Sequence, residues 1–183
     1  SGTFLVEAAM IGANIPANIN REHFAFQDWP DYDEELWKLI RSSQLKRAKD
    51  CYGRVIGYDL NPDTVASAKL NIANSGLEDY IEIHCENFFE TKKPEGPTHL
   101  VFNPPYGVRI QGDIPEMYKS IGDTLKKNYS GAEAWFLTSH MDGLKHVGLR
   151  ASRKIEIYQA KLECRFVKYE MYQGSKKMKY KQV

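Results

Sequence analysis

The stretch RVIGYDLNP, residues 54–62, joins a strand pattern directly to a helix start. Apolar residues between positions 55 and 58 predict a short strand, and Asp59 lies just past its apolar part. Asn61 can cap a helix, with Pro62 at the first helical position. A strand that leads into a capped helix is the unit from which parallel α/β sheets are built.

The rest of the chain alternates in the same way. Sequence patterns predict helices over 3–15, 31–50, 62–75 and 115–129, strands over 80–89, 98–102 and 132–139, and an antiparallel hairpin over 154–172 that turns around Gln159-Ala160. The first helix is expected to be buried on most sides, with Thr3 as its cap, and Gly76 is expected to end the third. The predicted fold is an α/β sheet, mostly parallel, with an antiparallel hairpin at its edge.

Length and composition favour a single soluble domain over residues 1–183. There is no signal-peptide pattern at the start, and no apolar run approaches the ~18 residues of a membrane span. The three cysteines are odd in number and far apart, so neither a disulfide framework nor a metal site is predicted. A reducing, cytoplasmic setting is therefore expected.

The net charge of +1 hides a basic end. Residues 150–183 hold 10 basic and 3 acidic side chains, whereas acids prevail before them. Such an end can face a polyanion, and it can equally be a solubilising tail. As RNA-binding candidates this end offers Arg150, Arg153, Lys154, Lys161 and Arg165.

Polar residues follow three of the predicted strands, at the edge where parallel sheets bind ligands. Asp59 can accept both hydroxyls of a ribose, or it can be a surface acid in a turn. Asn87 can bond an adenine amino group while Phe88 packs on the ring; the alternative is a turn asparagine and a core phenylalanine. At the start of the chain, Ser1-Gly2-Thr3 precede a helix and would let a polar ligand approach its N-terminus.

The third strand ends on the most specific motif, within HLVFNPPYGVRI at residues 99–110. The prolines hold Asn103 extended and leave the Pro104 carbonyl without a helix to join. These two acceptors can hold both N–H groups of a conjugated amine and aim its lone pair at an electrophilic methyl group. Tyr106 can stack on the base that carries the amine. The competing reading is a Pro-rich turn after an edge strand.

The order SGT–helix, GYDLN, ENF and NPPYG resembles a class I S-adenosylmethionine-dependent methyltransferase of the amino-methylating branch. The segments SGTFLVEAAMIG, NPPYGVRI and RASRKIEIYQAKLECRFVKYEM resemble, more specifically, the catalytic domain of bacterial THUMP-containing large-subunit rRNA guanine-N2 methyltransferases (the RlmL-like, UPF0020 group). The resemblance covers essentially the whole chain. It implies a Rossmann-like sheet, S-adenosylmethionine as cofactor and ribosomal RNA as partner.

Carried over by position, the resemblance implies roles for the motif residues. At the cofactor it implies Ser1, Gly2, Thr3, Asp59, Asn87 and Phe88, and at the target amine Asn103, Pro104 and Tyr106. The chain departs from the family pattern at Asn87, where the family has Asp, and at Tyr158-Gln159-Ala160, where it has Tyr-Asn-Gly. The family's first strand, which lies mid-sheet, and its THUMP domain are absent, so an N-terminally truncated catalytic domain is expected.

Two other functions stay open from the sequence. The NPPY motif is shared with adenine-N6 and protein glutamine-N5 methyltransferases, so it indicates the chemistry and not the substrate. A dinucleotide-binding oxidoreductase or a non-catalytic nucleotide-binding module would also use an acid such as Asp59, but neither would explain NPPY. The basic end favours a nucleic acid over a protein glutamine.

Overall fold

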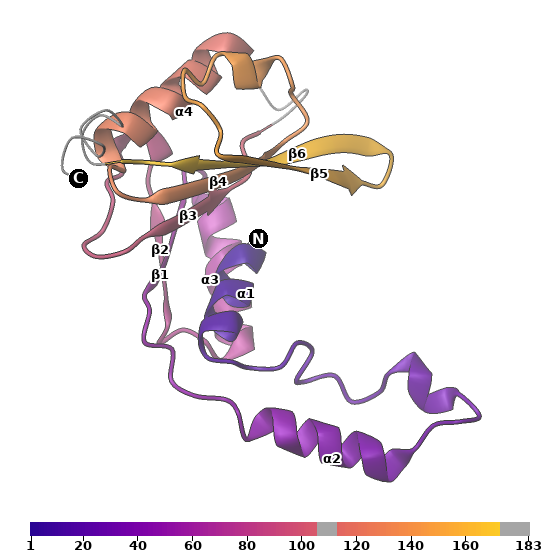
Figure 1. The fold of residues 1–183 in the computed structure, drawn as a ribbon. Coiled ribbons are helices and arrows are strands. Elements are labelled where there is room, and N and C mark those ends of the chain that lie inside the picture. Colours follow the sequence, from indigo (N-terminus) through magenta and orange to yellow (C-terminus); the bar gives the residue numbers. More distant parts are fainter. Residues whose placement is uncertain (106–112, 173–183) are drawn as a thin grey trace, which may run out of the picture. The chain divides into compact units, whose positions relative to one another are not determined.

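A computed structural model describes residues 1–105 and 113–172. The chain divides into two compact units, residues 1–88 and the residues from 89 onward, and each has its own sheet (Figure 1). The alternation of strands and helices confirms the predicted α/β class, with parallel pairs and an antiparallel hairpin. A single domain over 1–183 stays a prediction.

The first unit is built on two parallel strands. They are β1 (Val55–Asp59) and β2 (Ile81–Cys85), paired in register from Val55 opposite Ile81 to Asp59 opposite Cys85. Helices α1 (Thr3–Gly12) and α3 (Pro62–Ser75) pack with these strands. The core cluster contains Ala9, Ile72, Leu77 and Ile81.

Helix α3 begins and ends as predicted. The Asn61 side chain accepts hydrogen bonds from the backbone N–H groups of Asp63 (2.8 Å) and Thr64 (3.3 Å), and Pro62 occupies the first turn. Gly76 ends the helix in the left-handed region, at φ 66°, where a side chain would be strained. These caps keep the helix start directly behind Asp59.

Two expectations for α1 are wrong. Of its residues only Ala9 is buried, whereas Phe4 and Ile11 are 54% and 78% exposed. The helix is apolar nearly all round, yet only one face packs against the core of its own unit. The cap is not Thr3 but Gly2, which adopts φ 82° and makes no side-chain cap.

The segment between α1 and β1 holds a short 3-10 helix, η1 (Ala25–Asp28), and α2 (Glu34–Leu45). Helix α2 begins later than the predicted 31–50 because Asp33 caps it by accepting from the Leu36 N–H at 2.9 Å, and it also ends earlier, at Leu45. The ends of the segment are tied together, since Lys49 N donates to Ala13 O at 2.9 Å. Asn14 Nδ2 also donates to Arg47 O at 2.9 Å.

The second unit carries a four-stranded sheet in the order β3-β4-β6-β5. Its elements are η2 (Phe88–Glu90) at the unit boundary, β3 (His99–Phe102), α4 (Ile114–Asn128), β4 (Glu133–Thr138), η4 (Gly143–Lys145), β5 (Arg153–Gln159) and β6 (Leu162–Glu170). Strands β3 and β4 are parallel, and β6 runs antiparallel to both β4 and β5. The hairpin turns at Ala160, at φ 53°, as predicted.

Phe136 lies at the centre of the second core and is fully buried. Its ring centroid lies 5.0 Å from that of Phe102, 5.6 Å from Tyr169 and 6.2 Å from Tyr118. Aromatic pairs at these separations contribute beyond the area that they bury. The same side chains therefore connect β3, β4, β6 and α4.

Alkaline pH is expected to destabilise the protein through Tyr169. Burial raises the pKa of Tyr169 to about 12, and the side chain is only 2% exposed. Because the unfolded phenol ionises near pH 10, stability is full below that pH and falls by roughly 2–3 kcal/mol as the pH rises to about 12. Urea unfolding between pH 9 and 12 checks this. Tyr169→Phe should flatten the decline, and an equal decline in both proteins would refute the assignment.

Within residues 1–105 and 113–172, no helix combines the length and the apolar composition that crossing a bilayer requires. The three cysteines are free thiols.

Candidate cofactor and amine sites

Asp59 and Asn87 lie at one edge of the first sheet. Asp59 is the last residue of β1 and stands opposite Cys85, the last residue of β2. Just beyond the strands, the Glu86 N–H donates to the Asp59 carbonyl at 3.1 Å. The two parallel strands end side by side, so the polar residues at their ends lie next to one another at the edge where α/β sheets bind ligands.

The Asp59 carboxylate is held by the turn that follows it. Its Oδ1 accepts from the Asn61 backbone N–H at 2.9 Å, while Oδ2 makes no hydrogen bond to any residue that the structure describes. Burial, and then the charges of Glu86 and Glu82, raise the pKa of the neighbouring Tyr58 phenol. A fixed, half-buried carboxylate in such a turn can accept hydrogen bonds from two further donors.

Ser1-Gly2-Thr3 are held against α3. Asn71 Nδ2 donates to the Ser1 carbonyl at 2.8 Å. Gly2 lies so near α3 that an added Cβ would come 3.1 Å from the Ala68 Cβ, and its φ of 82° also favours glycine. No role beside Ser1-Gly2-Thr3 was predicted for Ala68 or Asn71. The only signal in the sequence is a small residue six positions after Pro62 and an amide nine positions after it.

The N-terminus of α1 points toward the edge that carries Asp59. Leu5 packs on the middle of β1, since an added Cβ at Gly57 would lie 2.5 Å from Leu5 Cδ1. Ala9, one turn later, lies in the core cluster against which Val55 packs, at the start of the same strand. Helix α1 therefore runs antiparallel to β1, and its first residues reach the ligand-binding edge.

Asn87 and Phe88 follow β2 directly. Both are half-buried, and Phe88 begins η2. The structure thus places all the predicted cofactor residues in the first unit: Ser1, Gly2, Thr3, Asp59, Asn87 and Phe88.

The predicted amine site lies in the second unit. Strand β3 ends at Phe102, so Asn103 is the first residue beyond it, as the sequence predicted. Asn103 is exposed, whereas Pro104 is buried and anchors the segment. Tyr106 lies outside the described residues. The side-chain oxygen of an exposed amide at a strand end can accept a hydrogen bond from a polar ligand.

Thr138 is a buried residue at the same sheet edge that the sequence reading missed. Because Phe102 stands opposite Phe136 in a parallel pair, the chain leaves β3 and β4 at the same edge of the sheet. The Thr138 hydroxyl bonds to the Tyr118 hydroxyl and accepts from the His140 N–H at 2.9 Å. Thr138 thereby fixes the start of the loop after β4. A threonine ending an apolar strand was the available signal.

The five predicted RNA-binding residues do not form one patch. Arg150, Arg153 and Lys154 lie together near the start of β5, whereas Lys161 lies at the hairpin turn. Consecutive strand residues point to opposite faces, so Arg153 and Lys154 diverge. These four side chains are exposed and form no ion pair with the residues described here.

Arg165 differs from the other four. Its side chain is only 25% exposed, and its guanidinium pairs with Glu156 (Nη2–Oε2 3.1 Å) and Glu163 (Nη2–Oε1 2.7 Å). The hydrogen bond from Tyr158 to Glu156, at 2.6 Å, also raises the pKa of the Tyr158 phenol. Much of the positive charge of Arg165 is therefore balanced within the hairpin.

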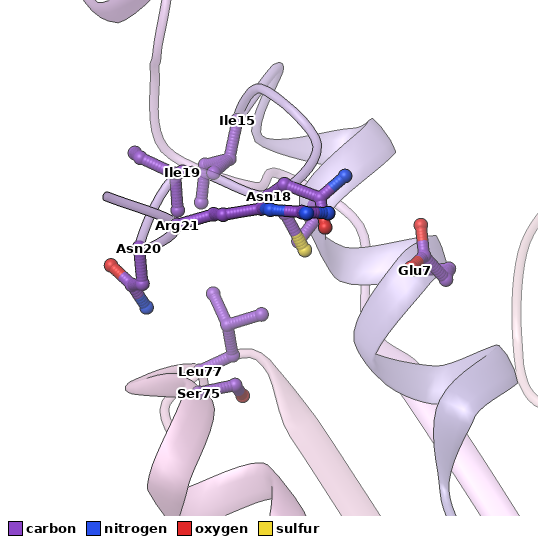
Figure 2. Close-up of a pocket in the computed structure, with 9 residues that line it drawn as sticks. Glu7, Ile15, Asn18, Ile19, Asn20, Arg21, Ser75 and Leu77 are labelled. Atoms are coloured by element: carbon purple, nitrogen blue, oxygen red, sulfur yellow. The ribbon is translucent and has the colours of Figure 1, made fainter. Parts of the chain in front are cut away.

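A pocket of about 320 Å³ lies at the other end of the first unit (Figure 2). It is lined by residues from the C-terminal parts of α1 and α3 and from the loop after α1, among them Met10, Arg21, Ser75 and Leu77. Both helices begin at the edge of Asp59, so this pocket lies at the opposite edge. It plays no part in the predicted cofactor site.

The family of the chain follows from comparison with known proteins. The family model described as the RMKL-like methyltransferase domain matches residues 1–168. The chain belongs to this family. The RMKL-like domain match runs from Ser1 to Lys168 and so includes every described residue of the two candidate sites.

Relatives of this RMKL-like domain are similar over nearly its whole length. The ribosomal RNA large subunit methyltransferase K/L of Shewanella sp. (strain W3-18-1) is 32% identical over 182 residues, 96% of this chain and 26% of the relative. The structure of SMU.472 complexed with SAH has a TM-score of 0.84 at 30% identity and covers 95% of this chain and 46% of its own. A protein described as "a possible methylase from Clostridium difficile 630" has a TM-score of 0.81 at 27% identity, covering 96% and 47%. The chain thus spans about a quarter of the curated relatives' length.

Proposed function

We propose that this chain is the catalytic domain of an S-adenosylmethionine-dependent RNA methyltransferase that modifies an exocyclic amine, guanine N2 of large-subunit ribosomal RNA. One observation carries the proposal: Asn103-Pro104 directly follow a parallel strand in a chain of the RMKL-like methyltransferase family. The K/L name of the Shewanella relative supports the RNA substrate.

The first unit supplies side chains that fit S-adenosylmethionine. The Oδ2 of Asp59 accepts the ribose hydroxyls, which are donors, and Asn87 accepts the adenine amino group while Phe88 packs on the ring. Ser1, Gly2 and Thr3 meet the cofactor's polar end at the start of α1, where exposed backbone N–H groups favour anions. The absence of a Cβ at Gly2 keeps the backbone close to α3. The SAH found with SMU.472 supports this cofactor class.

The second unit supplies the acceptors for the amine. The cofactor, when bound, supplies a methyl group on a positively charged sulfur. The Asn103 side-chain oxygen and the Pro104 carbonyl accept the two N–H groups of the target amine, orient its lone pair and stabilise its developing positive charge. Tyr106 stacks on the base and holds it unstacked from its neighbours. No strong general base is needed, because the nitrogen loses its proton readily once it carries positive charge.

RNA phosphates are bound by the exposed cations of the hairpin region. Arg150, Arg153, Lys154 and Lys161 contact separate phosphates, because Arg153 and Lys154 point to opposite faces of β5 and Lys161 lies at the hairpin turn. Arg165 contributes less, because two glutamates already share its charge. The relatives are about four times longer than this chain. We propose that part of this additional length is an upstream THUMP domain. We also propose that the protein acts in the cytoplasm, where ribosomal RNA is modified.

The longer protein that contains this chain, incubated with methyl-labelled cofactor and unmodified ribosomal RNA, tests the proposal. Nucleoside digestion should yield N2-methylguanosine. Label in N6-methyladenosine, or in the glutamine of a protein, would replace the substrate with one of the two alternatives. Binding of NAD in place of S-adenosylhomocysteine, with no transfer, would overturn the methyltransferase assignment.

Asp59→Ala is expected to weaken cofactor binding by about 1.5–3 kcal/mol for each charge-assisted hydrogen bond lost. Calorimetry with S-adenosylhomocysteine measures the loss. Asp59→Asn retains the acceptor for the Asn61 N–H, so this variant separates the ribose contact from the turn. Asp63→Ala, which removes a nearby carboxylate from the first turn of α3, is the matched control. Unchanged affinity in Asp59→Ala would remove Asp59 from the site.

A further inference from the structure

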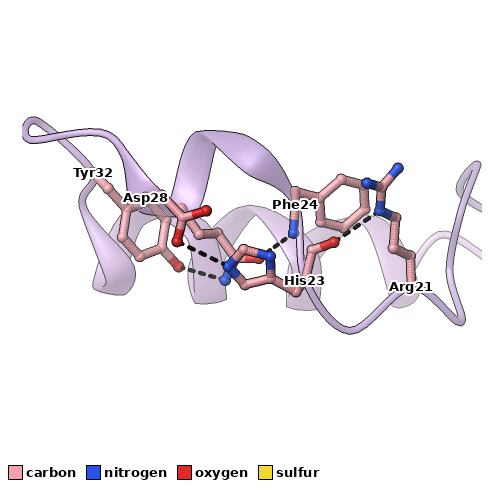
Figure 3. A network of polar contacts seen from close by, with 6 residues as sticks. Arg21, His23, Phe24, Asp28 and Tyr32 are labelled. Atoms are coloured by element: carbon pink, nitrogen blue, oxygen red, sulfur yellow. Dashed lines mark hydrogen bonds and ion pairs between the residues drawn. The ribbon is translucent and has the colours of Figure 1, made fainter.

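The segment from residue 15 to residue 48, called the arm below, contains an aromatic cluster of its own. The ring centroid of Trp37 on α2 lies 5.5 Å from that of Phe24 and 5.0 Å from that of Phe26. Figure 3 shows polar contacts that close the turn around η1, among them His23 Nε2 to Asp28 Oδ1 at 3.1 Å. One face of α2 is thus fixed within the arm.

The next face of α2 is apolar and exposed. Leu36, Leu39 and Ile40, called the α2 stripe, are 52%, 65% and 44% exposed. Residues at positions i, i+3 and i+4 lie on one side of a helix, so the three side chains form one continuous strip. Nothing in the described parts of the chain covers it. A continuous exposed strip of large aliphatic side chains on a helix is a candidate interaction surface.

Charges at the two ends of α2 are arranged for pairing with an identical helix. The first turn and its cap carry Asp33, Glu34 and Glu35, and the last turn is followed by Lys46 and Arg47. Glu35 and Lys46 are separated by about three helical turns and therefore lie on the same flank of the α2 stripe. If two copies of α2 lie antiparallel about a two-fold axis beside Ile40, Glu35 of each copy faces Lys46 of the other.

We propose that the α2 stripe is a self-association surface through which two copies of this protein pair antiparallel. The pairing buries Leu36, Leu39 and Ile40 against their symmetry mates and places each acidic helix start beside a basic helix end. The antiparallel arrangement also places the positive end of each helix dipole beside the negative end of the other, which is favourable. A two-fold contact of this kind is self-complementary, as the charge pattern of α2 requires. RNA is a poor occupant, because the strip itself has neither cations nor aromatic rings.

Sedimentation velocity of the longer protein over a range of concentrations tests the proposal. Leu39→Asp should raise the dimer dissociation constant at least about 30-fold, the effect of removing a central apolar contact. Leu70→Asp is the matched control, since Leu70 is equally exposed, at 67%, but lies on α3. Far-UV circular dichroism checks that both variants keep their helices. Equal dissociation constants for the two variants would overturn the proposal.

A charge-swap pair tests the antiparallel geometry. Glu35→Lys alone and Lys46→Glu alone should each weaken the dimer by about tenfold, since both cross-pairs become repulsive. An equimolar mixture of the two variants should form a heterodimer as tight as the original. Within one helix, Lys38 pairs with Glu34 at 2.9 Å and with Glu35 at 3.4 Å. Glu35→Lys removes only the longer pair, so the helix itself is little affected.

Two outcomes would refute self-association. One is a mixture that associates no better than either variant alone. The other is a protein that stays monomeric at about 100 μM, a concentration well above the dissociation constant expected of a specific dimer. In a monomer, slow hydrogen exchange at α2 would assign the stripe to another segment of the longer protein, and fast exchange would show it to be uncovered. In contrast to Asp59 and Asn103, none of the substituted residues belongs to the proposed methyltransferase sites, so these experiments stand apart from the activity assay.

Discussion

Asn103→Ala is expected to lower the rate of methyl transfer by about 10²–10³-fold, the usual effect of removing one fixed polar group from a developing charge. Asn103 is exposed at the end of β3, where its amide is proposed to hold the amine and not the cofactor. Affinity for S-adenosylhomocysteine should therefore stay nearly unchanged. Single-turnover methylation of ribosomal RNA and calorimetry measure the two quantities separately.

Asn103→Asp is the matched variant, because a carboxylate also accepts hydrogen bonds and has nearly the same shape. It should retain much more activity than Asn103→Ala. Val101→Ala, on the exposed part of the same strand, is a control for general disturbance of β3 and should have full activity. Wild-type turnover in Asn103→Ala would overturn the assignment of this segment to catalysis.

The strands and helices of the fold were predictable because local signals agree with the global pattern. Asn61, Pro62 and Gly76 define α3 at both ends, and each acts as its residue type does in general. The start of α2 was predicted too early because Asp33, and not the earlier Asp31, accepts the capping hydrogen bond. Helical periodicity alone does not distinguish between two acids that are both able to cap.

The candidate sites were likewise predictable only in part. Asp59, Asn87 and Asn103 could be placed at strand ends because the chain order of an α/β sheet fixes which residues follow a strand. Their supporting contacts depend on tertiary packing, so Ala68 beneath Gly2 and Tyr118 bonded to Thr138 could not be read from spacing. The roles of the motif residues stay predictions.

The basic end shows what composition cannot supply. Its excess of positive charge is plain from the sequence, but the register of the hairpin decides which charges are balanced. Glu156 stands directly opposite Arg165 across β5 and β6, and Glu163 lies two residues before it. Opposite charges in such cross-strand positions stabilise the sheet. Arg165 therefore stabilises the hairpin, whereas the side chains of Arg153 and Lys154 remain exposed.

Phe136→Ala is expected to reduce the free energy of unfolding by about 3–5 kcal/mol, the range for truncating a fully buried phenylalanine. The cavity would open beside Phe102, the residue that precedes Asn103, so the support of the amine site would loosen together with the core. Urea unfolding measures the loss.

Phe136→Leu leaves a much smaller cavity and should cost less than half as much, whereas Val101→Ala, 48% exposed on the neighbouring strand, should change stability by only about 0.5 kcal/mol. If Phe136→Ala lost no more stability than Val101→Ala, the ring would not be the centre of this core. The interior of the sheet would then support the position of Asn103 only through the backbone of β3. A folded Phe136→Ala protein that methylates slowly, while Phe136→Leu methylates normally, would instead tie the position of Asn103 to the packing of Phe102 on this ring.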